Sequence, residues 1–455
     1  MGAPCCAGGP GAVAGADGTP WSYVVGVAVA ALGFAPARLM LVTLVLTIGL
    51  PYLVLMLASP GQLHTTEAER TFTSPMQLTQ APLPTLRDAE EVQLSIVVPM
   101  YNEVQRLPAM LDDALAWLEG VRAAREPLAG AAGADVPRAA DESPAAAPKD
   151  GARADAAAGS VAAALTAPLR TYELVLVDDG SRDGTSDVAM AYAKQRALAP
   201  GAEIRLTRLH TNRGKGAAVR HGVLHARGAF VLFADADGAT RFADLRVLAR
   251  EMVRILTPEG HGIVVGSRAH LVKSEAVVKR SWVRNLLMRG FHVLLSVLMR
   301  PPSVRMLAER AVHAVVPAAL RPAPRAHVEA LALQPEVRDT QCGFKLFARA
   351  SAAAIFPLAH IDRWIFDVEL LLLAEIASRA SEADYVRRYG DAGRGADPLL
   401  RLALPIAEVA VHWTEIDGSK ISLLSDSVRM GRDLIIVRLN YALGRWAAPR
   451  SLYRS

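Results

Sequence analysis

Two carboxylates, Asp235 and Asp237, follow directly after the apolar run Ala229–Ala234 and stand two residues apart in the segment ADADGAT. Side chains two residues apart in an extended segment point to the same side, so both carboxylates can meet at the exit of a strand. Hard cations such as Mg²⁺ and Mn²⁺ prefer oxygen ligands and are often held by one or two carboxylates together with substrate phosphates. The pair therefore predicts a metal site that binds a nucleotide through its phosphates. A solvated turn closed by Gly238 is the simpler alternative.

Three further polar motifs follow strand-like apolar runs. They are Pro99–Glu103 after LSIVV, Asp178–Ser181 after YELVLV, and the basic glycine turn Asn212–Gly216 after EIRLTRLH. Segments with helical spacing, such as Pro108–Gly120, lie between these runs. This alternation predicts an α/β fold with a mostly parallel sheet flanked by helices, which binds ligands outside the carboxyl ends of its strands. Because four polar motifs share that edge, the metal-site interpretation is favoured over an isolated turn.

The composition narrows the class of protein. Of the 455 residues, 52% are hydrophobic, a share above that of most soluble proteins. The formal net charge of +5 comes from arginines scattered among few aromatic residues, which favours a membrane surface or an anionic substrate over nucleic acid. The three cysteines, Cys5, Cys6 and Cys342, have no metal-ligand spacing and are too few for a disulfide framework. A reducing compartment is therefore expected.

Two apolar runs near the N-terminus, Trp21–Phe34 and Leu39–Ala58, predict a membrane anchor. The second is uncharged and long enough to cross a hydrocarbon core of about 30 Å as a helix. The first is shorter and fits a partial span, an interfacial helix or the other arm of a hairpin. A cleaved signal peptide is the alternative, but no positive charge precedes the first run.

Two later stretches depart from the strand and helix pattern. The Ala-, Gly- and Pro-rich tract 123–168 is expected to be disordered, since it has few large apolar residues. The apolar stretch Trp282–Met299 is interrupted by Arg284, Arg289 and His292. It suits an interfacial helix better than a span, with an ordinary core helix as the alternative.

Eight spaced motifs together resemble the dolichyl-phosphate β-glucosyltransferases, which are inverting family 2 glycosyltransferases of the GT-A fold. The motifs are VVPMYNE, VDDGSRDGT, NRGKGAAVRHG, ADADGAT, GSRAH, DTQCGFKLF, RWIFDVELL and VHWTEIDGSK, and they cover most of Leu94–Trp446. The resemblance implies transfer of glucose from UDP-glucose to dolichyl phosphate with inversion, giving dolichyl β-D-glucosyl phosphate and UDP for lipid-linked oligosaccharide assembly and N-glycosylation. It also implies an endoplasmic reticulum membrane location, with the catalytic region facing the cytosol.

The resemblance assigns residues to the nucleotide-sugar donor. The positions that match donor contacts are Pro99, Tyr101, Glu103, Asp179, Lys215, Asp235 and Asp237. Of these, Asp235 and Asp237 would hold Mg²⁺ or Mn²⁺ beside the diphosphate, where the metal offsets charge on the departing UDP. Lys215 is expected near a phosphate, with a solvated lysine as the alternative.

The resemblance also assigns residues to the acceptor. Those expected near its phosphate are Arg268, Arg280, Arg284 and Lys420. Asp367 stands where inverting relatives with hydroxyl acceptors keep a general base, but a phosphate monoester is already mostly ionised, its second pKa being about 6. Asp367 is therefore expected to orient the sugar or a cationic partner, or else to pair with Arg363. The expected catalytic set is Asp237, Arg268 and Asp367, and Asp339 and Gln341 are expected to face the donor sugar.

The predicted organisation follows from these assignments. It comprises a flexible leader (1–20), a membrane anchor (21–58), a linker (59–91), a nucleotide-sugar-binding GT-A half (92–270) and an acceptor-binding half with membrane-interface helices (271–455), which carries inserts near 301–336 and 378–398. Two other functions compete with the glucosyltransferase prediction. One is a dolichyl-phosphate mannosyltransferase that uses GDP-mannose, and the other is a non-catalytic membrane scaffold that binds sugar nucleotides.

Overall fold

The computed structural model describes residues 42–43, 45–61, 65–75, 77–130, 155–196, 198–270, 337–389, 404–416, 423–449 and 452. The chain divides into two units, Met1–Ser59 and Pro60–Ser455. The first contains a π-helical turn, η1 (Val45–Gly49), and helix α3 (Leu50–Ala58). None of the helices within the described ranges combines the length and the apolar character needed to cross a bilayer. Part of the predicted span Leu39–Ala58 lies outside the described residues, so the span stays a prediction.

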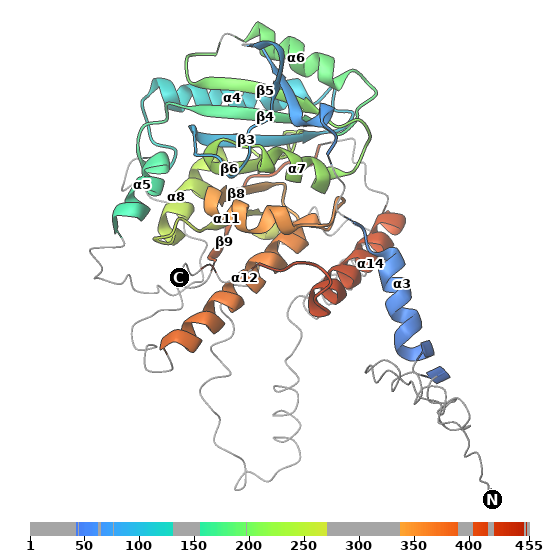
Figure 1. Cartoon of the computed structure of the whole chain (residues 1–455). Helices are drawn as coiled ribbons and strands as arrows, with labels where there is room; N and C mark the ends of the chain where they lie inside the picture. The colour runs from blue at the N-terminus through green and yellow to red at the C-terminus, as the bar shows by residue number, and fades with distance from the viewer. Residues whose placement is uncertain are drawn as a thin grey trace, which may run out of the picture. The chain divides into compact units, whose positions relative to one another are not determined.

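The second unit is built on one nine-stranded mixed sheet (Figure 1). Its strands are β1 (Thr71–Ser74), β2 (Gln77–Pro82), β3 (Val92–Met100), β4 (Tyr172–Asp178), β5 (Ala202–Arg208), β6 (Gly228–Ala234), β7 (Ile263–Ser267), β8 (Phe344–Ala348) and β9 (Ile406–Ala410), in the spatial order β2-β1-β5-β4-β3-β6-β8-β7-β9. The central strands β5, β4, β3 and β6 are parallel, as predicted. β8 runs antiparallel between β6 and β7, and β7 pairs in parallel with β9.

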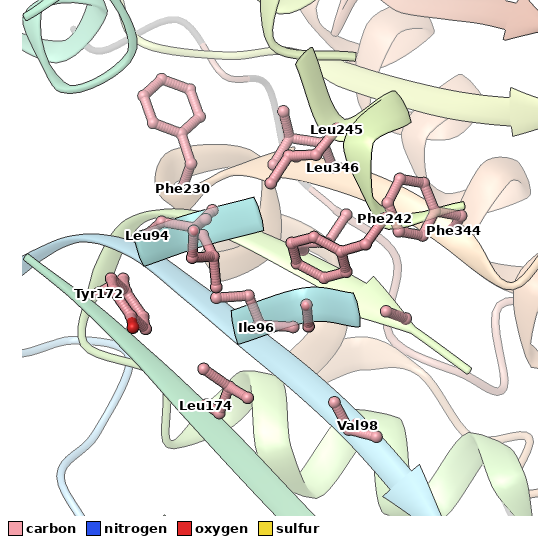
Figure 2. Packing of buried hydrophobic residues seen from close by; sticks show 14 of the residues in the cluster. Leu94, Ile96, Val98, Tyr172, Leu174, Phe230, Phe242, Leu245, Phe344 and Leu346 are labelled. Carbon is pink, nitrogen blue, oxygen red and sulfur yellow. The ribbon is translucent and has the colours of Figure 1, made fainter. Parts of the chain in front are cut away.

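Helices cover both faces of the sheet (Figure 1). They are α4 (Leu107–Ala123), α5 (Asp155–Thr166), α6 (Thr185–Gln195), α7 (Lys215–Leu224), α8 (Leu245–Ile255), α11 (Arg349–Ile355), α12 (Phe366–Tyr389) and α14 (Leu423–Ala442), with short 3₁₀ turns η2 (Ala68–Arg70), η3 (Phe242–Asp244) and η8 (Phe356–Leu358). Side chains of α4, α5, α6 and α8 join alternate strand residues in one hydrophobic cluster. Figure 2 shows part of this cluster, including Ile96, Phe242 and Phe344.

Helix α7 lies directly on the opposite face of the sheet. A Cβ atom at Gly222 would stand 2.4 Å from Val97 Cγ1 and 2.9 Å from Val177 Cγ2, so only glycine lets the helix approach β3 and β4 this closely. The same helix begins at Lys215, beside the end of β6. The close approach of α7 to the sheet therefore fixes where that lysine enters the site.

Part of the tract 123–168, where disorder is expected, forms a helix, and the described residues include the first part of the expected insert 378–398. Helix α5 occupies 155–166, and its Leu165 is fully buried in the core with Val161 packed beside it. An alanine-rich sequence forms a helix readily, and two apolar residues at i and i+4 spacing are enough to attach it. Helix α12 continues through Tyr389, and the Leu404 N–H donates to Ser378 Oγ at 2.8 Å. The other insert, 301–336, lies outside the described residues.

A buried ion cluster joins β4 to β5, and it yields a prediction about stability. Glu173 and Arg205 are both fully buried and pair at 2.6 Å, and Arg227 Nε pairs with the same carboxylate at 2.7 Å. Removing the carboxylate would leave Arg205 as an uncompensated buried charge. Glu173→Ala should therefore lower the free energy of unfolding by about 3–5 kcal/mol, as measured by urea denaturation. Exposed Glu259 is the matched control, and its alanine variant should change stability by less than about 0.5 kcal/mol. Equal losses in the two variants would contradict this account.

Candidate active site

Asp235 lies at the carboxyl end of β6, as predicted. It follows the last residue of the strand, and its backbone N–H donates to Gly343 O at 3.0 Å. A Cβ atom at Gly343 would stand only 1.9 Å from Asp235 Oδ2, so the carboxylate fills the space that a side chain would need. Lys215 Nζ pairs with Asp235 Oδ1 at 2.6 Å. The first carboxylate is thus held between the glycine of QCGF and the lysine of NRGKG.

Asp237 combines a turn contact with an unusual electrostatic setting. Its Oδ1 accepts a hydrogen bond from the Ala239 N–H at 3.0 Å, as the simpler turn interpretation expects. Burial and the neighbouring Asp235 raise the pKa of Asp237, while Lys215 and Arg106 oppose that shift. A buried carboxyl group whose ionisation a second carboxylate disfavours suits a divalent cation, which would offset both charges.

The donor set fits Mg²⁺ or Mn²⁺ bound together with a substrate. Within the described ranges, no group of three or more His, Cys, Asp or Glu side chains is arranged to hold a metal ion. Such a cation would therefore take two protein carboxylates, Asp235 and Asp237, and complete its shell with phosphate oxygens and water. Mg²⁺ in particular keeps several non-protein ligands because it gives up its water reluctantly.

Lys215 belongs to this cluster and is not a solvated lysine. It is the first residue of α7, and its side chain is 21% exposed. Burial alone would lower the pKa of Lys215, but Asp235, Asp367 and Asp237 raise it. The ammonium group is therefore a fixed positive charge beside the carboxylate pair, as expected of a group that contacts a diphosphate.

Asp367 has a cationic partner, and that partner is Lys345. The two side chains are almost completely buried, and Lys345 Nζ lies 2.7 Å from Asp367 Oδ1. The expected alternative, a pair with Arg363, is not what the structure contains. Lys345 Nζ also lies 5.5 Å from the centroid of the Phe233 ring, and Lys215 Nζ lies 5.3 Å from the same ring. Two lysine–aspartate pairs therefore share one aromatic ring at the end of β6.

Arg268 is paired with Asp339 directly after β7. Its Nε and Nη2 atoms donate to the two carboxylate oxygens of Asp339 at 2.7 and 2.9 Å, and its guanidinium lies 5.5 Å from the Trp413 ring. Asp339 was expected to face the donor sugar, but its carboxylate is engaged by this arginine. Gln341 donates to Trp364 O at 3.4 Å. Arg268 is 32% exposed, so it can still present its remaining N–H groups to a phosphate.

Two other carboxylates expected among the donor contacts, Asp179 and Glu103, are both engaged by protein groups. Asp179 accepts the backbone N–H groups of Arg213 and Gly214 at 2.8 Å each, which fixes the NRGKG turn beside β4. Glu103 pairs with Arg106 at 2.6 Å. A carboxylate has about four acceptor positions, so these bonds leave room for a ribose hydroxyl or a base N–H.

Asp179 predicts a pH-dependent stability. Burial raises its pKa from 3.8 to about 6, against the opposing backbone hydrogen bonds. Between about pH 4 and pH 6, Asp179 keeps its proton in the folded state but has released it in the unfolded chain. The contribution of Asp179 to the free energy of unfolding is therefore highest below about pH 4 and falls as the pH rises to about 6. Asp179→Asn should remove this fall, which amounts to about 3 kcal/mol at most. Unfolding free energies of the wild type and variant at pH 4 and pH 7 test this, and a difference that does not vary with pH would contradict it.

The remaining expected site residues divide between described and undescribed parts of the chain. Pro99 and Tyr101 are half-buried at the end of β3. Arg280, Arg284 and Lys420 lie outside the described residues, as does the expected interfacial helix Trp282–Met299. Lys345 and Arg106 were not predicted. The sequence does mark Lys345, because a charged residue inside the apolar strand FKLFA needs a buried partner. No comparable sequence pattern marks Arg106.

The sequence of this chain is similar to those of several known proteins. The model of the family "Glycosyl transferase family 2" matches residues 153–310. A dolichyl-phosphate beta-glucosyltransferase of Drosophila melanogaster is 38% identical over 381 residues, covering 83% of this chain and 84% of that protein. The Homo sapiens protein of the same name is 34% identical over 385 residues, covering 84% and 86%. A Mycobacterium tuberculosis glucosyl-3-phosphoglycerate synthase solved with Mn²⁺, UDP-glucose and phosphoglyceric acid is 16% identical, covers 80% of this chain and 88% of that chain, and has a TM-score of 0.36.

Proposed function

This chain belongs to the dolichyl-phosphate beta-glucosyltransferase family, and we propose that it transfers glucose from UDP-glucose to dolichyl phosphate with inversion, releasing UDP. The observation that carries this proposal is the carboxylate pair at the end of β6. Asp235 and Asp237 stand beside the fixed ammonium group of Lys215, at the edge of the sheet where parallel strands place their ligands.

On this proposal, Asp235 and Asp237 hold a divalent cation, Mg²⁺ or Mn²⁺, which offsets the charge that builds up on the departing UDP. Lys215 adds a second positive charge on the same side of the leaving group. Asp179 and Glu103 accept hydrogen bonds from the nucleoside while they keep the turns that carry them in place. These residues orient the sugar carbon towards the acceptor, and orientation of this kind is a large part of catalysis.

The acceptor needs no general base on this proposal. A phosphate monoester loses its second proton with a pKa of about 6, so it arrives as a nucleophile. Asp367 pairs with Lys345 and positions the sugar or the neighbouring lysines. Arg268 receives the acceptor phosphate and shares its charge with Asp339, and Arg280, Arg284 and Lys420 complete the cationic set.

Exposed apolar side chains support membrane attachment in each unit separately. On α3, Leu57 is 81% exposed, in a helix without charged residues. On α14, Val428, Ile435, Leu439 and the adjoining Leu443 form an exposed stripe at helical spacing. We propose that residues 39–58 span the endoplasmic reticulum membrane, that α14 lies at its surface, and that the catalytic unit faces the cytosol.

A transfer assay tests the proposed donor. Purified protein is given dolichyl phosphate, Mn²⁺ and labelled UDP-glucose or GDP-mannose, and label in the lipid is measured. Label from UDP-glucose is expected. Label from GDP-mannose alone would indicate the mannosyltransferase, and no label from either would indicate the non-catalytic scaffold.

A further inference from the structure

A cavity that shares no lining residue with the proposed transfer site lies beside α7. Its volume is about 180 Å³, and its polar lining comes from Arg70, Arg213, Arg220, His221, His225 and Asp362. None of these side chains is assigned to the donor or the acceptor. The cavity is polar and large enough for a small ligand with several hydrogen-bonding groups.

The guanidinium group of Arg220 lines this cavity with only part of its hydrogen-bonding capacity used. Its Nε donates to Phe356 O at 3.3 Å, and the described part of the chain gives its terminal nitrogens no further partner. Burial lowers the pKa of Arg220, although the charge of Asp362 opposes that shift. An incompletely paired, partly buried guanidinium is costly and matches the geometry of a phosphate group. Arg70, whose Nε donates to Thr65 Oγ1 at 3.2 Å, adds a second positive charge to the cavity wall.

His221 contributes a buried, neutral ring to the cavity wall. The residue is 4% exposed, and its Nδ1 atom is buried and has no hydrogen-bond partner among the described residues. Its Nε2 lies 3.3 Å from Thr207 Oγ1, and that hydroxyl has the Thr71 carbonyl within donating distance at 3.1 Å. The Thr207 hydroxyl has one proton, which it donates to the Thr71 carbonyl, so its oxygen accepts a hydrogen bond from His221 Nε2–H. The neutral ring then has no proton on Nδ1. Burial lowers the pKa of His221 to about 3, so the ring stays neutral at physiological pH.

Asp362 supplies a hydrogen-bond acceptor to the cavity. Its backbone oxygen receives the Ala217 N–H at 3.0 Å, but within the described ranges its carboxylate has neither a hydrogen bond nor an ion pair. Burial raises the pKa of Asp362 to about 6, and Arg220 opposes the shift. Arg220 and Asp362 therefore line the same cavity without pairing directly. One part of the lining is cationic and another part accepts hydrogen bonds.

We propose that this cavity binds a small phosphoester that also carries an amino or hydroxyl group, with the phosphate on Arg220 and Arg70 and the donor group on Asp362. O-phosphoethanolamine has this chemistry. The same group occurs free in solution and as the headgroup of a phospholipid. The wall residues Thr65 and Arg70 follow the apolar helix α3 closely in the sequence.

The test is binding of O-phosphoethanolamine to the full chain in detergent, measured by titration calorimetry. Arg220→Gln should weaken binding about tenfold or more, because it removes the charge that pairs with the phosphate. Arg254→Gln, on exposed Arg254 of α8, is the matched control and should bind like the wild type. No saturable binding by the wild type, or equal binding by Arg220→Gln with its unfolding midpoint unchanged, would overturn the proposal.

Two further binding measurements test the orientation and the source of the ligand. Asp362→Asn should weaken binding of O-phosphoethanolamine while leaving binding of inorganic phosphate unchanged or stronger, because it removes only the carboxylate charge. The opposite order would contradict the proposed orientation. Short-chain phosphatidylethanolamine, titrated beside the free phosphoester, identifies the source: tighter binding of the lipid assigns the cavity to a headgroup, and tighter binding of the free compound assigns it to a soluble ligand.

Discussion

Asp237→Ala is expected to reduce the rate of glucosyl transfer by about 10²–10³-fold or more, because it removes one of two carboxylates that would hold the cation beside the leaving diphosphate. Burial and Asp235 already disfavour ionisation of this group, so its charge is useful only where a cation offsets it. The measurement is the initial rate at saturating UDP-glucose over a range of Mn²⁺ concentrations.

Asp187 provides the matched control for this loss. It is an exposed aspartate in the first turn of α6, and Asp187→Ala should leave the rate unchanged. Asp237→Asn keeps the size of the side chain and its turn contact with the Ala239 N–H. If the asparagine variant retained the full metal-dependent rate, the metal would have been assigned to the wrong residues.

Lys345→Met is expected to cause the second large loss, about 10²-fold, and to change how the rate depends on pH. Burial raises the pKa of Asp367, and the charges of Lys345 and Lys215 oppose that shift. Without Lys345 the carboxylate takes up a proton more readily, so the pKa rises further and activity should appear only at higher pH. The measurement is kcat/KM for UDP-glucose from pH 5.5 to pH 9 in the variant and the wild type.

The pH profile separates an electrostatic role from a structural one. Lys194→Met, on an exposed lysine of α6, should leave the profile unchanged. If Lys345→Met lowered the rate equally at every pH, the pair would be acting only through the stability of the fold. A double variant with Asp367→Asn should lose little more than the worse single variant, since the two side chains interact directly.

The strand ends could be predicted from the sequence because they follow local rules. A sequence of apolar run, polar motif and helical spacing recurs four times, and the strands β3, β4, β5 and β6 coincide with those apolar runs. The edge that gathers Asp179, Lys215 and Asp235 follows from parallel pairing alone. That part of the site needed only periodicity and a rule about where parallel sheets bind ligands.

The partners of the charged residues could not be predicted in the same way. Asp367 pairs with Lys345 across 22 positions and Arg268 with Asp339 across 71, through contacts that exist only after β8 inserts antiparallel between β6 and β7. No local pattern encodes that insertion. Helix α5 was missed because its alanine-rich sequence resembles a linker, and Leu165 alone gives little sign that the helix packs on the core.

We propose that Asp235 and Asp237 bind the diphosphate of the donor through a divalent cation. The most direct measurement is the affinity of the purified chain for UDP, by titration calorimetry, with Mn²⁺ present and after its removal by EDTA. We expect saturable binding of UDP with Mn²⁺, a large loss of affinity in EDTA, and no Mn²⁺-dependent gain in Asp237→Ala. Equal affinity for UDP in Mn²⁺ and in EDTA would contradict the claim.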